Sequence, residues 1–209
     1  MTICKPVSPK LCSTIILAGG ASKRMGRDKA TLPWNGKTLL EDLVQRFHQY
    51  SSKILVVAAI QQKIPPLPEH VHLVHDASAF PGPLWGLYYG LRAVMHSGPV
   101  FVTGCDYPLL PAELPAFLMQ HYEESSACLF QHHGQIQPFP GLYSTGVIRI
   151  LEKLLSEGAT SMRALLAQCP HTVISEQIWQ KQLPEDVFLN MNTPEDYELA
   201  LNRWLTSKA

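Results

Sequence analysis

The sequence predicts a single α/β domain whose mostly parallel sheet is covered by helices on both faces. Three observations predict it: short apolar runs recur along the chain, stretches of helical periodicity separate them, and a glycine-rich loop follows the first run. Parallel strands need a crossover long enough to hold a helix, so this alternation indicates βαβ units. With 209 residues, of which 46% are hydrophobic, the chain can bury one sizeable core.

The alternation is clearest in the first half of the chain. Apolar runs that predict strands cover residues 14–18, 53–60, 71–74 and 99–103. Helical spacing predicts helices over residues 39–47, 84–95 and 113–122. Asn35-Gly36 is typical of a turn, as are the prolines of residues 65–68. Right-handed crossovers place the carboxyl ends of the four strands along one edge, where ligands bind in such sheets.

The second half is less regular. Residues 132–137 are typical of a turn-rich linker, and residues 141–143 are expected to begin a strand. We also expect short strands at residues 173–174 and 188–189 and helices at 147–155 and 161–167. Thr193 is typical of a helix N-cap, with Pro194 at the first helical position and Asp196 at the third. No internal repeat or second domain boundary is evident, so we expect a tail over residues 1–12 and one domain over residues 13–209.

Charge and cysteine content exclude several function classes. Lys and Arg together number 17, as do Asp and Glu, so no net charge attracts nucleic acid or an anionic membrane. The five cysteines form no Cys-x-x-Cys pair, which argues against a zinc site or a disulfide framework, and Cys105 is typical of a small core residue. Residues 1–10 lack an apolar signal segment, and no apolar run is long enough to span a membrane. We therefore expect a soluble, cytoplasmic protein.

The most informative segment is residues 17–29, which read Leu-Ala-Gly-Gly-Ala-Ser-Lys-Arg-Met-Gly-Arg-Asp-Lys. Gly19 and Gly20 let backbone N–H groups close on an anion, and Arg24 and Lys29 add positive charge. The spacing matches neither the G-x-G-x-x-G fingerprint nor a Walker A loop, in which Thr31 would have to be glycine. A plain strand-to-helix turn explains the glycines alone but not the added charge. We therefore expect this loop to hold a nucleoside triphosphate.

Two acidic residues follow other predicted strands, so they should converge with the glycine loop on one crevice. Asp106, which precedes Tyr107-Pro108, either stabilises a turn or holds Mg²⁺, an ion that needs only one or two carboxylates. Asp76 is open to the same turn explanation. Chemistry on a bound triphosphate relies on cations and a metal that offset its negative charge. We expect Arg24, Lys29 and Asp106 to carry this chemistry, with Asp106 as the metal ligand.

These segments resemble the motifs of the molybdenum cofactor guanylyltransferase family, MobA-like nucleotidyltransferases that attach GMP to molybdopterin. Beside residues 17–29, the resemblance rests on Asp76 with PGPLWG at residues 81–86, GCDYP at 104–108, Gln137-Pro138 before GLY at 141–143, and NMNTPED at 190–196. It covers nearly the whole chain, except the first dozen residues and the segment around residues 61–68. It implies a Rossmann-like fold, GTP and molybdopterin as substrates, Mg²⁺ as cofactor, and delivery of the product to molybdoenzymes or their chaperones.

The resemblance also implies roles for single residues. It places the backbone of Leu17, Ala18 and Gly19 against the base and sugar of the nucleotide, and Gly20 favours GTP over CTP. It gives Asp106 the role of the metal-binding aspartate.

Three further residues take roles from the resemblance. It brings Asp76 into contact with the nucleotide. Asn190 and Asn192 resemble residues that close the pocket near the acceptor phosphate, although capping of the last helix explains them equally well. Apart from the resemblance, Arg163 is a weaker candidate for binding an acceptor anion, because an exposed helical arginine is the commoner explanation.

Two departures from the family pattern concern the substrate. Residues 57–59 are Val-Ala-Ala where the family often has an asparagine near the guanine, and Trp85 stands where the family usually has a small residue. Trp85 could narrow the pocket or stack on the acceptor. The alternatives are a molybdopterin cytidylyltransferase, a cobinamide-phosphate guanylyltransferase, or a nucleotide-binding module without turnover. Intact Arg24, Lys29 and Asp106 argue against the last of these.

Overall fold

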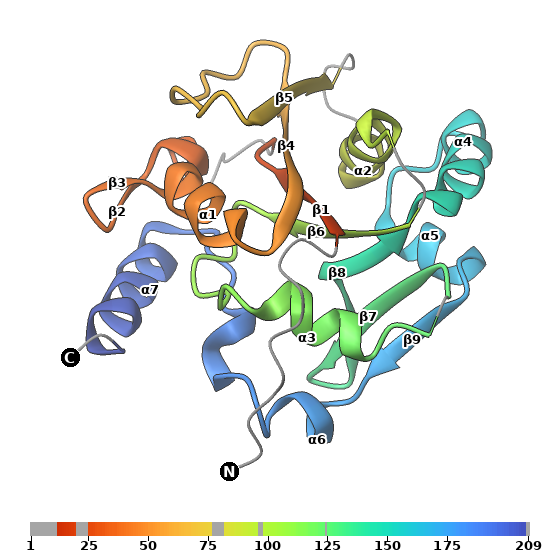
Figure 1. The fold of residues 1–209 in the computed structure, drawn as a ribbon. Coiled ribbons are helices and arrows are strands. Elements are labelled where there is room, and N and C mark those ends of the chain that lie inside the picture. The colour runs from red at the N-terminus through yellow and green to blue at the C-terminus, as the bar shows by residue number, and fades with distance from the viewer. Residues whose placement is uncertain (1–11, 20–24, 77–81, 96–97, 124, 208–209) are drawn as a thin grey trace.

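A seven-stranded sheet forms the centre of the molecule in the computed structural model, which describes residues 12–19, 25–76, 82–95, 98–123 and 125–207 (Figure 1). Its strand order is β5-β4-β1-β6-β8-β7-β9. These strands are β1 (Cys12–Leu17), β4 (Ser51–Ala59), β5 (Val71–Asp76), β6 (Pro99–Gly104), β7 (Ala127–His132), β8 (Gln135–Ser144) and β9 (His171–Ile174).

The first four strands of the chain's sheet confirm the expected parallel arrangement. β1 lies between β4 and β6 and pairs in parallel with both, and β5 adds in parallel to β4. β8 then pairs antiparallel with β6 and β7, and β9 returns in parallel beside β7. The carboxyl ends of β1, β4, β5 and β6 therefore lie along one edge, where ligands bind in open α/β sheets.

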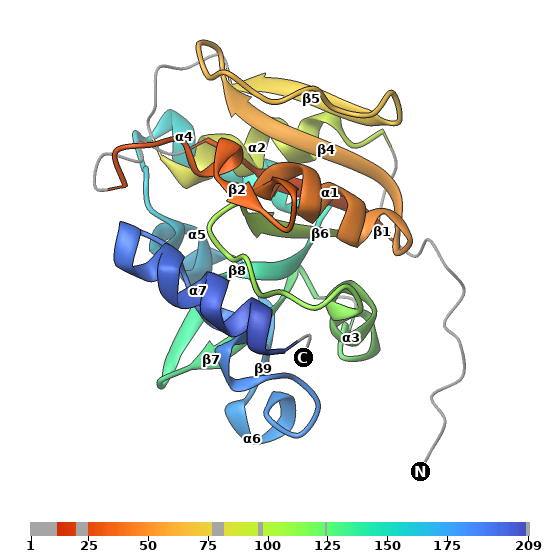
Figure 2. The ribbon, with the colours of Figure 1, turned by 90° about the vertical axis from the view of Figure 1, so that its left-hand side faces the viewer.

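Helices cover both faces of the sheet (Figures 1 and 2). α2 (Pro83–Ala93), α4 (Ile148–Ser156) and α5 (Met162–Gln168) pack together on one face. α1 (Leu39–His48) and α3 (Leu114–Gln120) lie on the other, with α7 (Pro194–Thr206) beside α1 in the second view. Short elements complete the described part: the β2 (Pro33–Trp34) and β3 (Lys37–Thr38) ribbon, α6 (Glu176–Trp179), and the 3₁₀ helices η1 (Lys29–Thr31), η2 (Thr145–Val147) and η3 (Glu185–Phe188).

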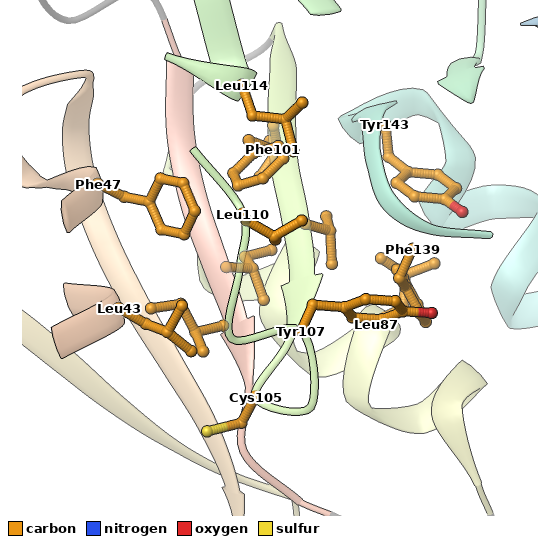
Figure 3. Packing of buried hydrophobic residues seen from close by; sticks show 14 of the residues in the cluster. Leu43, Phe47, Leu87, Phe101, Cys105, Tyr107, Leu110, Leu114, Phe139 and Tyr143 are labelled. Atoms are coloured by element: carbon orange, nitrogen blue, oxygen red, sulfur yellow. The ribbon is translucent and has the colours of Figure 1, made fainter. Parts of the chain in front are cut away.

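Local sequence explains why α1 forms where it does. Asn35 and Gly36 both adopt positive φ, at 50° and 76°, as a tight turn between β2 and β3 requires. Thr38 then begins α1 with a capping box, in which its hydroxyl and the Glu41 carboxylate each accept from the other's backbone N–H. Phe47, at the end of the apolar stripe of α1, meets Phe101 of β6 edge-on with 5.1 Å between ring centroids (Figure 3).

α2 approaches the sheet closely because of its glycines. A Cβ at Gly90 would lie 2.9 Å from side-chain carbons of Ile15, and one at Gly86 would lie 3.3 Å from Leu17 Cδ2. Gly82, with φ of 108°, precedes the helix, and a Cβ there would lie 2.9 Å from the Thr160 carbonyl oxygen. These contacts hold the start of α2 against the end of β1 and against the loop before α5.

Two predictions about the second half were wrong. Residues 132–137 are not a linker, because β7 and β8 form a hairpin whose turn places His133 and Gly134 at positive φ of 50° and 70°. Residues 188–189 do not form a strand, since Phe188 ends η3. The predicted N-cap at Thr193 is confirmed, and its capping box with Asp196 begins α7.

The described cysteines are core residues, as expected for Cys105. Cys12, Cys105, Cys128 and Cys169 are all buried with free thiols. Burial is the main cause that raises the pKa of the Cys105 thiol, which argues against a nucleophilic role. None of the helices in the described ranges combines the length and the apolar character that crossing a membrane requires.

Candidate active site

The loops that follow β1 and β6 begin side by side. The Cys105 N–H donates to the Leu17 carbonyl at 3.0 Å, which extends the β1–β6 ladder past the strand ends. On the other side, the Ala18 N–H donates to the Val57 carbonyl of β4 at 2.8 Å. The backbone of Leu17, Ala18 and exposed Gly19 therefore lies at the centre of the ligand-binding edge.

The sequence around Asp106 turns its carboxylate back over the end of β6. A Cβ at Gly104 would lie only 2.2 Å from Asp106 Oδ1, so a glycine is needed beside this carboxylate. Cys105 and Tyr107, on either side of Asp106, are buried and reach into the surrounding apolar packing (Figure 3). The short loop is thus anchored by its neighbours while Asp106 keeps 28% of its side-chain surface exposed.

Lys29 brings the loop after β1 to the same place. Its Nζ lies 3.6 Å from Asp106 Oδ2 and donates to Asn192 Oδ1 at 3.0 Å. The Lys29 side chain is 15% exposed, so its charge is directed into the site rather than into bulk solvent. A cation and a carboxylate from two separate sequence segments therefore meet at the sheet edge, as the sequence predicted for the two loops.

The segment before α7 supplies the third side of the site. The Met191 N–H donates to the Asp106 carbonyl at 2.9 Å, and Asn192 Nδ2 donates to Asn190 Oδ1 at 3.1 Å. Asp196 receives the Asn192 and Thr193 N–H groups at 2.8 and 2.9 Å. The cap of α7 thus holds Asn192 where its side chain accepts a hydrogen bond from Lys29. Asn192 therefore takes part in the capping segment and also contacts a charged residue of the candidate site.

Competing influences act on the Asp106 carboxyl group. Burial has the largest effect and raises its pKa above the ordinary value, whereas the Lys29 ammonium and a hydrogen bond with Asn190 act in the opposite direction. The net shift of the pKa is upward, so Lys29 and Asn190 do not fully offset the cost of burying the ionised carboxylate. A bound cation would offset the rest of that cost.

Gln62 is a site residue that sequence reasoning missed. Its Nε2 donates to the Ala18 carbonyl at 2.9 Å and to Asp28 Oδ2 at 2.8 Å. Asp28 Oδ1 meanwhile accepts from the Ala30 N–H at 2.9 Å and so caps η1, which begins with Lys29. The one available signal was the position of Gln62 shortly after an apolar strand, and nothing in its surroundings resembles a motif.

Some predicted site residues lie elsewhere or are not described. Asp76 is buried at the end of β5, and β4 and β1 separate β5 from β6, which puts the two strand ends about 14 Å apart. The structure therefore does not bring Asp76 against Asp106. Gly20 and Arg24 lie outside the described residues.

The structure also locates Trp85 and residues 57–59, where the sequence departs from the family pattern. Trp85 lies in α2, where its ring stacks on Tyr89 at 5.7 Å and meets Tyr88 edge-on at 5.8 Å between centroids. Val57, Ala58 and Ala59 are buried in β4 and offer no polar side chain. Arg163 is exposed on α5.

The donor set limits which metal the site could hold. Within the described ranges no three His, Cys, Asp or Glu side chains gather to form a metal site. Among the described residues, Asp106 offers a carboxylate with the amide of Asn190 beside it. That set suits a hard ion such as Mg²⁺, which keeps several waters and takes further oxygens from substrate phosphates. It does not suit zinc, which needs several nitrogen or sulfur ligands.

Sequence comparison connects this arrangement to known proteins. Residues 14–173 match the profile of the MobA-like NTP transferase domain. A probable molybdenum cofactor guanylyltransferase of Carboxydothermus hydrogenoformans is 34% identical, over 89% of this chain and 93% of that protein. A probable molybdenum cofactor guanylyltransferase of Mycobacterium avium is 39% identical, over 87% of this chain and 91% of that protein.

Solved structures share the fold at lower identity. The molybdopterin-guanine dinucleotide biosynthesis protein A of Archaeoglobus fulgidus superposes with a TM-score of 0.76 at 19% identity, covering 94% of this chain and 100% of that one. The 2-C-methyl-D-erythritol 4-phosphate cytidylyltransferase of Thermus thermophilus superposes with a TM-score of 0.69 at 18% identity, covering 92% and 98%. At these identities the likeness concerns the fold alone.

Proposed function

The chain belongs to the MobA-like NTP transferase family, and from that premise we propose that it transfers GMP from GTP to molybdopterin and releases pyrophosphate. The products are the guanine dinucleotide form of the cofactor and pyrophosphate. The family's nucleotidyltransferases typically use a divalent metal, and we propose Mg²⁺ for this chain.

The observation that carries the proposal is the meeting of Lys29 with Asp106. An enzyme that joins two phosphate-bearing molecules must reduce the repulsion between them and stabilise the pyrophosphate that leaves. Lys29 Nζ, held at 3.0 Å from Asn192 Oδ1, is a positive charge that can move onto a triphosphate without leaving the site. Its contact with Asp106 at 3.6 Å is long for an ion pair, so the carboxylate can exchange the ammonium for another cation.

Asp106 is the proposed ligand of the divalent metal. Asp106 would hold the metal, and the chemistry that Mg²⁺ would supply there is neutralisation of charge on the triphosphate. The protein's part is to present an ionised carboxylate from a rigid loop and to keep Lys29 on the phosphate side. The raised pKa of Asp106 is consistent with a carboxylate that is fully compensated only with a cation present.

The remaining proposed roles concern binding rather than chemistry. We propose that the backbone of Leu17, Ala18 and Gly19 lies against the base and sugar, because these residues form the centre of the strand-end edge. Asn190 and Asn192 border the same charges and are proposed to face the acceptor phosphate. Gly20, Arg24 and Asp76 keep their proposed nucleotide contacts as family-based assignments.

Pyrophosphate release measured with GTP, CTP and ATP, each with and without molybdopterin, tests the proposal. We expect release only with GTP and molybdopterin together, and loss of that release when EDTA removes the metal. Equal or greater release with CTP would replace GTP by CTP as the donor. No release with any nucleotide would contradict the proposed reaction.

A further inference from the structure

A single side-chain amide beside the site bonds two backbone groups and one carboxylate. The Nε2 group of Gln62 donates to the Ala18 carbonyl at 2.9 Å and to Asp28 Oδ2 at 2.8 Å, while its Oε1 accepts from the Ala59 N–H at 3.3 Å. The Gln62 N–H also donates to the Ala59 carbonyl at 3.0 Å. Both amide protons and the amide oxygen are therefore used, at the ends of β1 and β4 and at the turn before η1.

The hydrogen bonds of Asp28 also fix the backbone of the next residue, Lys29. With Oδ2 held by Gln62, the other oxygen caps η1 by accepting from the Ala30 N–H at 2.9 Å. The Asp28 carbonyl accepts from the Thr31 N–H at 3.2 Å and from the Thr31 hydroxyl at 3.0 Å. Lys29 lies between these bonds as the first residue of η1. The orientation of Asp28 therefore sets the direction in which Lys29 leaves the backbone.

We infer that Gln62 is a positioning residue, which keeps Lys29 in register with Asp106 by holding Asp28 against the end of β1. The inference rests on the proposed function, in which Lys29 binds a triphosphate. Only a neutral amide of this length satisfies all three groups. Glutamate has no proton to donate and would place a second carboxylate against Asp28, and alanine reaches none of them.

Gln62 is placed to act through the groups it holds, which are Asp28 beside Lys29 and the Ala18 carbonyl. A displacement of about 1 Å at a charged group in an active site can lower the rate about 100-fold. We expect Gln62→Ala to lower kcat/KM at least tenfold, mostly by raising KM for the nucleotide. Gln62→Glu should be more severe because of the added repulsion.

The experiment compares four variants by pyrophosphate release and by thermal melting. Gln61→Ala is the matched control, since Gln61 is the exposed neighbour of the same residue type. The double variant Asp28→Asn with Gln62→Glu exchanges the amide and the carboxylate across the 2.8 Å contact. The amide introduced at position 28 can then donate to the carboxylate introduced at position 62. We expect the control to stay within twofold of wild type and the double variant to recover at least tenfold over Gln62→Glu.

Three outcomes would overturn the inference: kcat/KM of Gln62→Ala within twofold of wild type, a double variant no better than Gln62→Glu, or a loss of activity that only follows the unfolded fraction. A wild-type protein inactive with every nucleotide would contradict the proposed function and not this inference. Crystal structures of wild type and Gln62→Ala then decide, because the inference requires the distance from Lys29 Nζ to Asp106 to change. An unchanged distance would overturn it.

Discussion

The ammonium of Lys29 lies 3.6 Å from the carboxylate of Asp106, although the two residues come from loops that follow different strands of the sheet. The contact exists because β1 and β6 are parallel neighbours whose strand-end loops begin side by side, joined from Cys105 to Leu17 by a hydrogen bond. Sheet topology, more than the local sequence of either loop, produces the proposed site.

Replacing Lys29 should weaken binding of the triphosphate. A hydrogen bond to a charged group contributes about 1.5–3 kcal/mol, so Lys29→Met should raise the GTP dissociation constant about 10- to 100-fold. Isothermal titration calorimetry measures this directly, with Lys153→Met on the exposed face of α4 as the control. An unchanged affinity in Lys29→Met would remove Lys29 from the binding site.

Replacing Asp106 should separate activity from stability. Asp106→Asn removes the proposed metal ligand, and we expect turnover to fall by about 10³-fold or more. Because burial raises the pKa of Asp106, the ionised carboxylate weakens the folded state at neutral pH, and the amide should not lower the melting temperature in metal-free buffer. Pyrophosphate release tests the predicted loss of turnover, and thermal melting tests the predicted stability. Turnover near that of wild type would refute the metal role.

The same pKa shift predicts a pH dependence. A carboxyl group with a raised pKa in the folded state binds more protons there than in the unfolded state, so its contribution to stability is greatest at low pH. That contribution declines as the pH rises through the interval above 3.8, the ordinary value. A divalent metal needs the ionised form. As the pH is lowered, activation by the metal should therefore be lost at a higher pH than it would be with an aspartate of ordinary pKa.

Lys29 provides the test of this pH dependence. Its ammonium lowers the pKa of Asp106, so Lys29→Met should move the acid limb of metal activation to still higher pH. Magnesium titrations over a pH series that starts near the ordinary value of 3.8 measure the shift. An acid limb that stays in place in Lys29→Met would mean that a group other than Asp106 controls metal activation.

Arg46 should be important for stability, because it joins α1 to the loop beyond Asp106. Its Nη1 donates to the Pro108 and Leu110 carbonyls, each at 2.7 Å, and its guanidinium pairs with Asp42, with side-chain exposures of only 8% and 7%. Arg46→Met leaves the Asp42 charge buried without its partner. The free energy of unfolding should fall by about 3–5 kcal/mol in urea titrations.

Arg92 is the matched control for Arg46. It pairs with Glu152 at 3.1 Å, but the two side chains are 57% and 46% exposed. Solvent screens such a pair, so Arg92→Met should cost less than about 1 kcal/mol. Equal losses in the two variants would show that burial of the Arg46 pair has no special effect.

The parallel half of the fold was predictable because its signals are local. Apolar β-branched runs, an Asn-Gly turn and helical spacing each report directly on backbone conformation, and right-handed crossovers then order the strands. The errors came where the chain leaves that pattern. Residues 132–137 contain few residues typical of strands. The hairpin of β7 and β8 forms there because β8 also pairs with β6 and β7 also pairs with β9, and both of those strands are distant in sequence.

The site was predictable only in part. Lys29 and Asp106 each follow an apolar strand, so topology alone brings them to one edge. Gln62 could not be found in this way, because its role depends on hydrogen bonds to Ala18 and Asp28, two residues that are distant from it in sequence. Asp76 ends β5, which lies at the edge of the sheet, away from β6. The order of the strands, which cannot be read from the sequence, therefore places Asp106 and not Asp76 beside Lys29.

A crystal structure with GTP and magnesium tests the central claim most directly. The account predicts the triphosphate at the carboxyl ends of β1 and β6, with Lys29 on phosphate oxygens and Asp106 on the metal. Nucleotide bound elsewhere, with Lys29 still paired to Asp106, would contradict it.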